Sequence, residues 1–372
     1  MPTFAFRVDA SIQIGTGHVI RCVTLANELR NLGSNCIFIT RKCEGNLIEY
    51  IKKKKFQICE LEISTLGDHI DKSIKNLKKN DNVYKSSELD VDAQETLLKL
   101  KRHKIDWLIV DHYQIDFTWE SKLRTASAKI MVIDDLANRL HDCDLLLDQN
   151  LRINAEKRYK SLIPKNCTRL FGPRNVILHP SFDKGTDRVR DGKIKHILVY
   201  FGGYDIHNQA LNVLKALQNF PQITAEVVLG ASHPYREQVH AYAQANIVVS
   251  DLVDMAESMR KADLAIGVCG IAAWERCSMG LPSLVCINAN NQIEDSENLH
   301  RLGAIECLGL SAEVGAVDWY KAVLKLMNNP SRILFMGENA KEVVKGHSIN
   351  RQILLNHLFS KGPIDSVVTL QD

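Results

Sequence analysis

The sequence predicts an α/β protein built from two doubly wound domains. The chain has 372 residues, more than one domain of about 100–200 residues usually needs. Short apolar segments recur along it and alternate with segments whose apolar residues repeat every three or four positions. Unbroken apolar strands separated by helices are typical of parallel sheets that are covered on both faces.

The predicted strands fall into two series along the chain. The first comprises residues 4–8, 36–39, 107–110, 130–133 and 145–147, and the second comprises residues 196–201, 225–229, 247–249, 264–266, 284–287 and 305–308. Helical periodicity follows several of them, as at Val19, Val23, Ala26 and Leu29, which Gly33 closes.

The polar stretch at residues 181–195 separates the two series. We therefore place an N-terminal domain at residues 1–182 and a C-terminal domain at residues 183–361. Residues 63–103 are rich in Lys, Asn and Asp, which predicts an exposed insertion in the first domain. Residues 362–372 are expected to form a loose tail.

Composition excludes several classes of protein. The chain carries 47 basic and 44 acidic residues, so its net charge of +3 provides no broad field for nucleic acid or an anionic membrane. No apolar segment approaches the roughly 20 residues that cross a bilayer. Arg7 and Asp9 interrupt the apolar start, so we expect no signal peptide. The ten cysteines are scattered and show no metal-binding spacing. We expect a cytoplasmic protein with no cofactor, no metal and no obligate protein partner.

Residues 9–21 (DASIQIGTGHVIR) form the first candidate site. They follow a predicted strand, and ligands of open α/β sheets bind beyond the carboxyl ends of strands. Gly15 and Gly17 permit a tight turn and the close approach of a ligand. Asp9 and Arg21 bound this loop and are candidate substrate ligands.

His18 opens the helix that follows and is the candidate catalytic base, because a neutral imidazole can take a proton from water near neutral pH. A structural histidine at the helix start is the alternative interpretation. The dinucleotide pattern G-x-G-x-x-G fails, because Ile20 occupies its third glycine position.

Polar residues also follow the later strands of the first domain. Tyr113 ends the segment DWLIVDHY and can hydrogen-bond a substrate or a water, or else pack as a strand-end tyrosine. Asn150, after the strand at 145–147, is a candidate substrate ligand. Asp134 and Asp135 raise the possibility of a divalent metal, but no other ligand cluster accompanies them.

Two segments of the second domain are candidate nucleotide sites. Gly202, Gly203 and Asp205 lie between a strand and a helix, where backbone N–H groups can seat a diphosphate, although a plain turn is also possible.

The second segment spans residues 263–292. Gly270 follows a strand, Glu275 can accept hydrogen bonds from a ribose diol, and Asn291 and Gln292 bring uncharged donors and acceptors to the same end of the sheet. Glu275 as a solvated helix residue is the alternative.

These motifs together resemble a known family. RVDASIQIGTGHVIRCVTLA, DHY, LLDQN, LFGP, FGGYDIHN, WERCSMGLP and NANNQ match, in order, motifs of UDP-2,4-diacetamido-2,4,6-trideoxy-β-L-altropyranose hydrolases of pseudaminic acid biosynthesis, over residues 4–310. The resemblance implies a glycosyltransferase B-type fold, in which two Rossmann-like domains face each other across a cleft.

The resemblance also implies residue roles and a reaction. His18 would activate water for attack at C1 of the sugar, with Tyr113 and Asn291 lining the sugar site. Gly202 and Gly203 would hold the diphosphate, and Glu275 would bind the ribose. The products would be UDP and the free sugar, with inversion at C1. The sequence departs from the family's usual residues at Ala272, Ala273, Asn175 and His179.

Three other functions fit the same motifs. A glycosyltransferase would pass the sugar to an acceptor hydroxyl instead of water, and fold alone does not separate the two. A hydrolysing 2-epimerase, or a hydrolase of another nucleotide sugar, would use a similar site. A non-catalytic nucleotide-sugar binding protein is the alternative from a different class.

Overall fold

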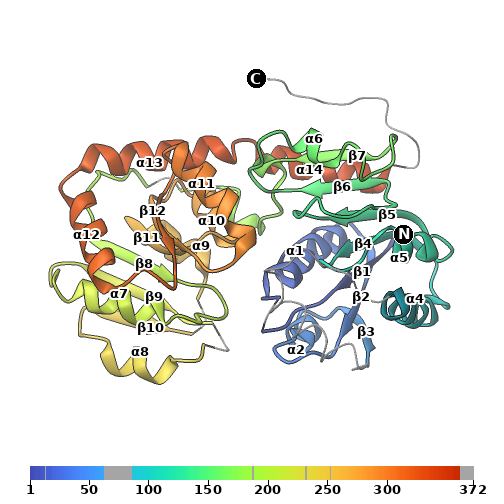
Figure 1. The fold of residues 1–372 in the computed structure, drawn as a ribbon, viewed down its shortest axis with the longest axis horizontal. Coiled ribbons are helices and arrows are strands. Elements are labelled where there is room, and N and C mark those ends of the chain that lie inside the picture. Colours follow the sequence, from blue (N-terminus) through green and yellow to red (C-terminus); the bar gives the residue numbers. More distant parts are fainter. Residues whose placement is uncertain (13, 63–85, 187, 231–232, 252, 361–372) are drawn as a thin grey trace. The chain divides into compact units, whose positions relative to one another are not determined.

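The computed structural model describes residues 1–12, 14–62, 86–186, 188–230, 233–251 and 253–360, which form two compact α/β units (Figure 1). Unit 1 comprises Met1–Gln149, Ile153–Ile177 and Ser348–Asp372, and unit 2 comprises Asn150–Arg152 and Leu178–His347. Each unit contains one parallel sheet with helices on both faces, as the apolar strands predict.

The sheet of unit 1 has seven strands in the order β3-β2-β1-β4-β5-β6-β7. All of its strand pairs are parallel. The strands are β1 (Thr3–Val8), β2 (Asn35–Arg41), β3 (Gln57–Leu61), β4 (Ile105–Asp111), β5 (Ser127–Ile133), β6 (Leu145–Asp148) and β7 (Thr168–Phe171).

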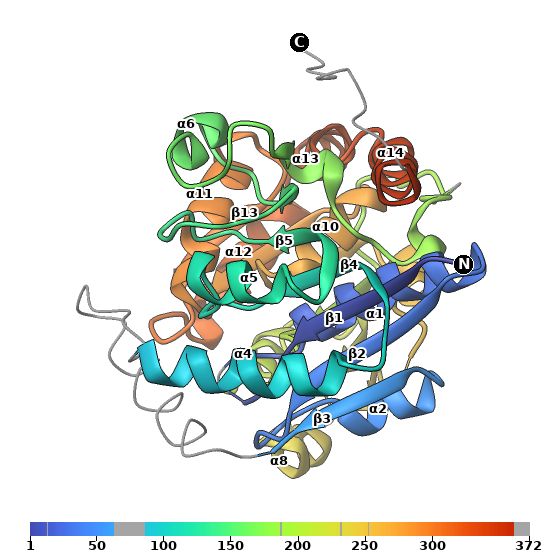
Figure 2. The ribbon, with the colours of Figure 1, turned by 90° about the vertical axis from the view of Figure 1, so that its right-hand side faces the viewer.

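Helices cover both faces of this sheet. The helices of unit 1 are α1 (Gly17–Asn31), α2 (Ile48–Lys53), α4 (Ser86–Leu100), α5 (Phe117–Leu123), α6 (Ala155–Tyr159) and α14 (His347–Phe359), with the 3₁₀ turn η1 (Pro173–Asn175). Helix α1 buries Val19 and Val23 against Phe4 and Phe6 of β1. Helices α4 and α5 lie side by side on the opposite face (Figure 2).

The last helix returns to unit 1, contrary to the predicted C-terminal domain at residues 183–361. Leu354, Leu355 and Leu358 of α14, red in Figure 1, join the apolar cluster that contains Phe4 and α1. The apolar residues of α14 are only weakly segregated to one face, so the sequence pattern does not indicate which sheet covers the helix.

The exposed insertion predicted at residues 63–103 is wrong for its second half, while residues 63–85 lie outside the described residues. Residues 86–100 form α4, which buries Leu89, Ala93 and Leu100 against the sheet. The acidic residues of this segment suggested a solvated face, but Asp92 is buried and accepts hydrogen bonds from Arg7.

The sheet of unit 2 has six parallel strands in the order β10-β9-β8-β11-β12-β13. They are β8 (His196–Tyr200), β9 (Thr224–Val228), β10 (Ile247–Ser250), β11 (Leu264–Val268), β12 (Ser283–Ile287) and β13 (Glu306–Leu310). The helices and 3₁₀ turns are α7 (Gln209–Leu217), α8 (Arg236–Tyr242), α9 (Met255–Lys261), α10 (Ile271–Ser278), α11 (Ile293–Arg301), α12 (Ala316–Met327), α13 (Pro330–Val343), η2 (Pro180–Phe182) and η3 (Asn290–Gln292).

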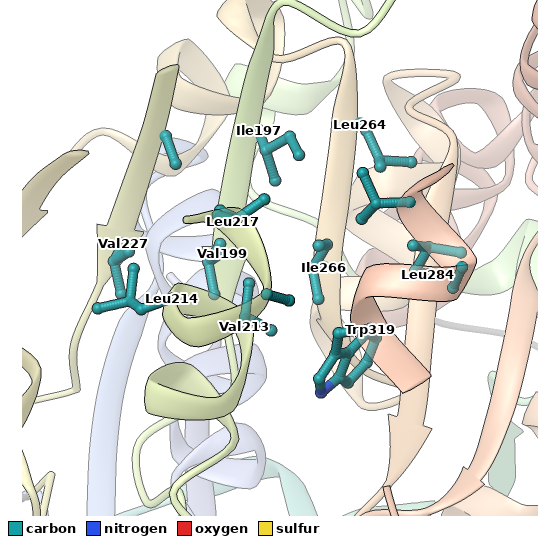
Figure 3. Packing of buried hydrophobic residues seen from close by; sticks show 14 of the residues in the cluster. Ile197, Val199, Val213, Leu214, Leu217, Val227, Leu264, Ile266, Leu284 and Trp319 are labelled. Carbon is teal, nitrogen blue, oxygen red and sulfur yellow. The ribbon is translucent and has the colours of Figure 1, made fainter. Parts of the chain in front are cut away.

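The core of unit 2 is shown in Figure 3. Side chains of α7, including Val213 and Leu217, meet Ile197 and Val199 of β8, and Trp319 of α12 packs against the same cluster. Successive strand residues point to opposite faces of the sheet. The residues of β8, β11 and β12 that point away from α7 and α12 therefore face α9, α10 and α11, which contact those strands.

Two strands were not predicted from the sequence, β3 and β7. Each lies at an edge of the sheet of unit 1 and is only partly buried. Such edge strands carry polar residues and lack the unbroken apolar run by which the central strands are recognised. Among the described residues, no helix combines the length and apolar character needed to cross a membrane, and the cytoplasmic location stays a prediction.

The buried position of Asp92 yields a stability prediction. Its carboxylate accepts hydrogen bonds from Arg7, Arg41 and the Trp119 indole. Although burial opposes ionisation, the charge of Arg7 holds the pKa of Asp92 at about 2. Asp92→Ala leaves two buried guanidinium groups without this partner, and should lower the free energy of unfolding by about 3–5 kcal/mol.

Asp90 on the same helix is the matched control, because it is half-exposed and its ion-pair partner among the described residues is Lys122. Asp90→Ala should cost about 1 kcal/mol or less. Urea unfolding of the three proteins measures the difference, and equal stability of the two variants would contradict the buried network.

Candidate functional site

The motif loops of both units lie at the carboxyl ends of central strands, where the chain's direction across the sheet reverses. In unit 1 this point lies between β1 and β4, and in unit 2 it lies between β8 and β11. Ligands of doubly wound sheets bind at such points. Each unit therefore presents one candidate site, which we describe separately.

In unit 1, His18 lies in the first turn of α1 and contacts the end of β4. Its Nδ1 lies 2.5 Å from Oδ1 of Asp111, and both side chains are buried. Asp111 pairs with Val8 in the sheet, so the loop after β1 starts beside it. The parallel pairing of β1 with β4 thus brings together two residues that are far apart in the sequence.

Arg21 holds the same carboxylate from the next turn of α1. Its Nε and Nη2 donate to the two oxygens of Asp111, each at 2.6 Å, and Nη2 lies 3.1 Å from Nδ1 of His18. Burial alone would raise the pKa of Asp111, but the charge of Arg21 and the hydrogen bonds from Arg21 and His18 hold that pKa well below its usual range. The group is therefore a carboxylate at any physiological pH.

This geometry selects one tautomer of His18. A carboxylate accepts hydrogen bonds only, so the short contact requires Nδ1 of His18 to carry the proton that Asp111 accepts. Nε2 is then the unprotonated nitrogen of the neutral ring. Among the described residues, no hydrogen-bond partner contacts Nε2. The ring can therefore accept a proton from a bound molecule at Nε2.

Tyr113 lies beside the histidine. The two rings meet edge to face, with 4.6 Å between centroids. The Tyr113 hydroxyl donates to Asp135 at 3.4 Å. The two predicted catalytic residues, His18 and Tyr113, are thus neighbours, although their roles stay predictions.

Asp9 lies behind this group and is already fully engaged. It accepts hydrogen bonds from the backbone N–H of Arg41 and from Thr40, and forms an ion pair with Arg7. Its second oxygen lies 3.1 Å from Nε2 of His112. We interpret Asp9 as the residue that ties the ends of β1, β2 and β4 together. A direct substrate contact of Asp9 stays a prediction.

His112 is neutral in this arrangement. Its Nδ1 accepts the backbone N–H of Gln114, so Nε2 is the donor to Asp9. Burial also lowers the pKa of His112. The ring fixes the start of the loop that carries Tyr113.

The two predicted glycines of this site, Gly15 and Gly17, differ in whether the backbone conformation requires glycine. Gly15 has φ of 81° and donates its N–H to the Ser11 carbonyl, so it needs the left-handed backbone. Gly17 is the first residue of α1, and a Cβ there would meet nothing within 4 Å. Gly17 leaves open space directly before His18.

The aspartates after β5 have partners other than a metal. Asp134 pairs with Arg139 at 2.8 Å and accepts the Tyr159 hydroxyl at 2.9 Å. Asp135 accepts from Tyr113. Within the described residues, no three His, Cys, Asp or Glu side chains are grouped to hold a metal ion.

In unit 2, the loops after β8, β11 and β12 are neighbours, because these strands are adjacent in the sheet. Gly270 is the N-cap of α10, and a Cβ on it would lie 3.7 Å from the side-chain amide of Gln292 in η3. The structure thus brings together Gly270, Asn291 and Gln292, which the sequence predicted as substrate ligands.

Glu275 lies one turn into α10 and is half-buried. No hydrogen bond or ion pair of its carboxylate with the described residues is present, and burial raises its pKa to about 7. Tyr200, at the end of β8, has its pKa raised to about 12 by burial and by the charge of Glu275. An acceptor without a protein partner is therefore available at this end of the sheet.

The glycine loop after β8 stays a predicted diphosphate seat, and contacts within unit 2 hold its backbone. Gly202 has φ of 86°, and the backbone of Gly203 packs against Gly230. The carboxylate of Asp205 accepts the backbone N–H groups of Gln209 and Ala210 at the start of α7. Asp205 therefore fills this helix start itself, and its contact with a substrate stays a prediction.

Asn150 begins a short segment that packs within unit 2. Next to it, the N–H of Leu151 donates to Asp295 at 2.8 Å, and the Leu151 carbonyl accepts from Asn298. Arg152 also pairs with Asp295. The segment is thus anchored to α11, directly after the η3 turn that carries Asn291.

Sequence reasoning did not select Asp111 as a site residue. The signal for Asp111 was its position at the end of a central strand, but its pairing with His18 depends on the strand order.

Comparisons with known sequences show distant relatives, and no family model matches the chain. It is 26% identical over 297 residues to the uncharacterized protein MJ1062 of Methanocaldococcus jannaschii, covering 76% of this chain but only 54% of that protein. It is 26% identical to the spore coat polysaccharide biosynthesis protein SpsG of Bacillus subtilis, over 68% of this chain and 77% of SpsG.

A third relative carries the name that the sequence motifs suggested. The UDP-2,4-diacetamido-2,4,6-trideoxy-β-L-altropyranose hydrolase of Campylobacter jejuni is 25% identical over 240 residues, which is 64% of this chain and 73% of that enzyme. The relationship to this hydrolase and to SpsG is distant.

Solved structures establish the fold. MurG of Acinetobacter baumannii superposes with a TM-score of 0.63 at 13% identity, over 96% of this chain and all of that chain. The spinosyn rhamnosyltransferase SpnG gives a TM-score of 0.62 at 12% identity, over 95% of this chain and 99% of that chain. The chain has the glycosyltransferase B-type fold of two Rossmann-like domains.

Proposed function

We propose that the protein hydrolyses a UDP-linked 2,4-diacetamido-2,4,6-trideoxy sugar at C1, with His18 as the general base. The observation that carries the proposal is the short contact between Nδ1 of His18 and Asp111, which leaves Nε2 as the basic nitrogen. The motif resemblance and the name of the Campylobacter jejuni relative support the sugar and the nucleotide.

In the proposed reaction, Nε2 of His18 removes a proton from water as the water oxygen attacks C1. The bond between C1 and the diphosphate oxygen breaks, UDP leaves with the bonding electron pair, and the configuration at C1 inverts. Asp111 stabilises the imidazolium that forms and keeps the ring in its orientation, as carboxylates do in other histidine-based sites. Positioned general-base catalysis contributes about 10²–10⁴-fold.

The nucleotide is assigned to unit 2. Glu275 accepts hydrogen bonds from the ribose hydroxyls, because its carboxylate has no hydrogen-bond or ion-pair partner among the described residues. Asn291 and Gln292 provide amide groups at the neighbouring strand end. The diphosphate lies near the loops after β8 and β11, whose glycines permit close approach of the backbone.

A proton NMR time course with UDP-2,4-diacetamido-2,4,6-trideoxy-β-L-altrose as the only substrate tests the function. Hydrolysis predicts free sugar and UDP in equal amounts, with the α anomer formed first. Slow release that accelerates on adding an acceptor sugar or lipid would favour a glycosyltransferase. Tight UDP binding without turnover on any UDP-sugar would favour a binding protein.

His18→Asn is expected to lower turnover by at least about 10²-fold, because the side chain loses the base but keeps similar size. UDP affinity, measured by calorimetry, should change less than about 2-fold, since the nucleotide is assigned to unit 2. His240→Asn is the control, because this histidine is exposed on α8. Unchanged turnover in His18→Asn would remove His18 from the mechanism.

Glu275 predicts a pH-dependent affinity for the nucleoside. Its pKa of about 7 means that the carboxylate, the form that accepts ribose hydroxyls, predominates above pH 7 and is lost below it. Uridine carries no phosphate, so its affinity should fall about 10-fold from pH 8 to pH 6 through this group alone. Glu275→Gln should bind uridine weakly at both pH values.

The control for this variant is Glu257→Gln, whose carboxylate pairs with Arg260 on the surface of α9. It should keep the wild-type affinity and pH dependence. Because a raised pKa penalises the folded state as pH rises through about 7, Glu275→Gln should also unfold at a higher temperature than the wild type at pH 8. A pH-independent wild-type affinity for uridine would refute the ribose role.

A further inference from the structure

Arg276 is a buried arginine that forms no ion pair with the residues that the structure describes. It lies on α10 and is 3% exposed. Its Nη2 donates to the Val268 carbonyl at 2.8 Å, whereas its Nε is buried without a hydrogen-bond partner. No carboxylate of the described residues forms an ion pair with it. Buried charges in proteins are usually paired, so this exception calls for a physical cause.

The groups around Arg276 do not neutralise it. Cys269 and Cys277 are buried thiols whose pKa values burial raises to about 12, so both are neutral. Glu275 precedes Arg276 on the helix and attracts it electrostatically, but adjacent helical side chains do not face each other and the two groups form no ion pair. Burial lowers the pKa of Arg276, but a guanidinium stays charged at physiological pH.

The guanidinium lies under the turn between β11 and α10. The hydrogen bond to Val268 places it at the last residue of β11, and a Cβ on Gly267 would come within 3.3 Å of its Nη1. Side chains of a helix lean towards its N-terminus, which accounts for this position. The charge is therefore located where the amino end of α10 begins.

That helix end has no negative partner of its own. Gly270 is the N-cap and offers no side-chain acceptor, and the first turn contains no acidic residue. Asp205 and Asp254 accept backbone N–H groups at the starts of α7 and α9, and α8 and α11, which also lack a side-chain cap, have acidic residues in their first turns. The amino end of a helix carries a partial positive charge, which at α10 adds to that of Arg276.

We propose that Arg276 is a positioning residue for a diphosphate-bearing ligand at residues 268–271, the turn between β11 and α10. Through its hydrogen bond to Val268 it holds the turn so that the first backbone N–H groups of α10 face the ligand. The negative charge of the ligand then compensates the positive charge of Arg276 and of the helix end, which have no such partner in the free protein. The ligand's diphosphate follows from the proposed function, whereas the site's preference for an anion follows from Arg276 and the uncapped helix.

The test compares ligands that differ only in phosphate. Calorimetry with UDP, UMP and uridine is carried out on the wild type, Arg276→Gln and Arg276→Lys. We expect Arg276→Gln to lose about 10–100-fold in UDP affinity, less in UMP affinity and less than about 3-fold in uridine affinity. Arg276→Lys keeps the charge and should recover part of the loss. Raising the salt concentration should weaken UDP binding less in Arg276→Gln than in the wild type.

Arg301→Gln is the matched control, because Arg301 is exposed in the last turn of α11. It should bind all three ligands as the wild type does. Thermal unfolding and circular dichroism establish that each variant is folded. Equal losses for UDP and uridine in Arg276→Gln would assign Arg276 a structural role only, and an unchanged UDP affinity would overturn the proposal.

Failure of the proposed function gives a different pattern. GDP and dTDP are measured alongside UDP on the wild type and on Arg276→Gln. A wild type that binds GDP or dTDP but not UDP, or that binds UDP without hydrolysing UDP-sugars, refutes the proposed function while the Arg276 effect persists. A wild type that binds no nucleoside diphosphate overturns the role of Arg276 as well.

Discussion

The site in unit 1 depends on one carboxylate, that of Asp111. It accepts from Arg21 through two nitrogens and from His18 through Nδ1, all within 2.6 Å. Arg21 keeps the acid ionised in a buried position, and the ionised acid in turn fixes the tautomer of the histidine. The arrangement is possible because β1 and β4 are parallel neighbours, so that α1 starts beside the end of β4. Register, charge and tautomer are therefore consequences of the same strand pairing.

The two units treat buried charge differently. In unit 1, the Asp92 carboxylate accepts hydrogen bonds from the guanidinium groups of Arg7 and Arg41, and Asp9 accepts the backbone N–H of Arg41. Buried positive and negative charges are therefore paired within this unit. In unit 2, Glu275 and Arg276 lie next to each other in the sequence and attract each other electrostatically, yet neither forms an ion pair with the described residues. Unpaired buried groups cost folding free energy, and proteins tend to retain such costs where function requires them. On the proposed function, the missing partners are the ribose and the diphosphate.

The sequence predicted the parts of the fold whose signal is local. Central strands such as β1 and β8 are unbroken apolar runs, and the loops after them carry the glycines and polar residues that mark the site. Edge strands β3 and β7, the packing of α14 on unit 1 and the burial of Asp92 were not predictable in the same way. Each depends on which surface covers the segment, and composition and periodicity describe a segment without its neighbour. The partnership of His18 with Asp111 was missed for the same reason, because it requires the strand order.

On the proposed function, hydrolysis and glycosyl transfer would place the same demand on His18, because either reaction requires the loss of a proton from an attacking O–H group. The difference lies in which O–H group reaches Nε2. Gly17 adds no side chain before His18, and Tyr113 lies against the ring's side with its hydroxyl directed to Asp135. These residues fix the base without choosing between water and a larger acceptor. The choice between water and a larger acceptor would therefore depend on the other residues that line the proposed sugar site. A change of acceptor would require no change in the His18, Asp111 and Arg21 group. This is the physical reason why one fold can serve both chemistries.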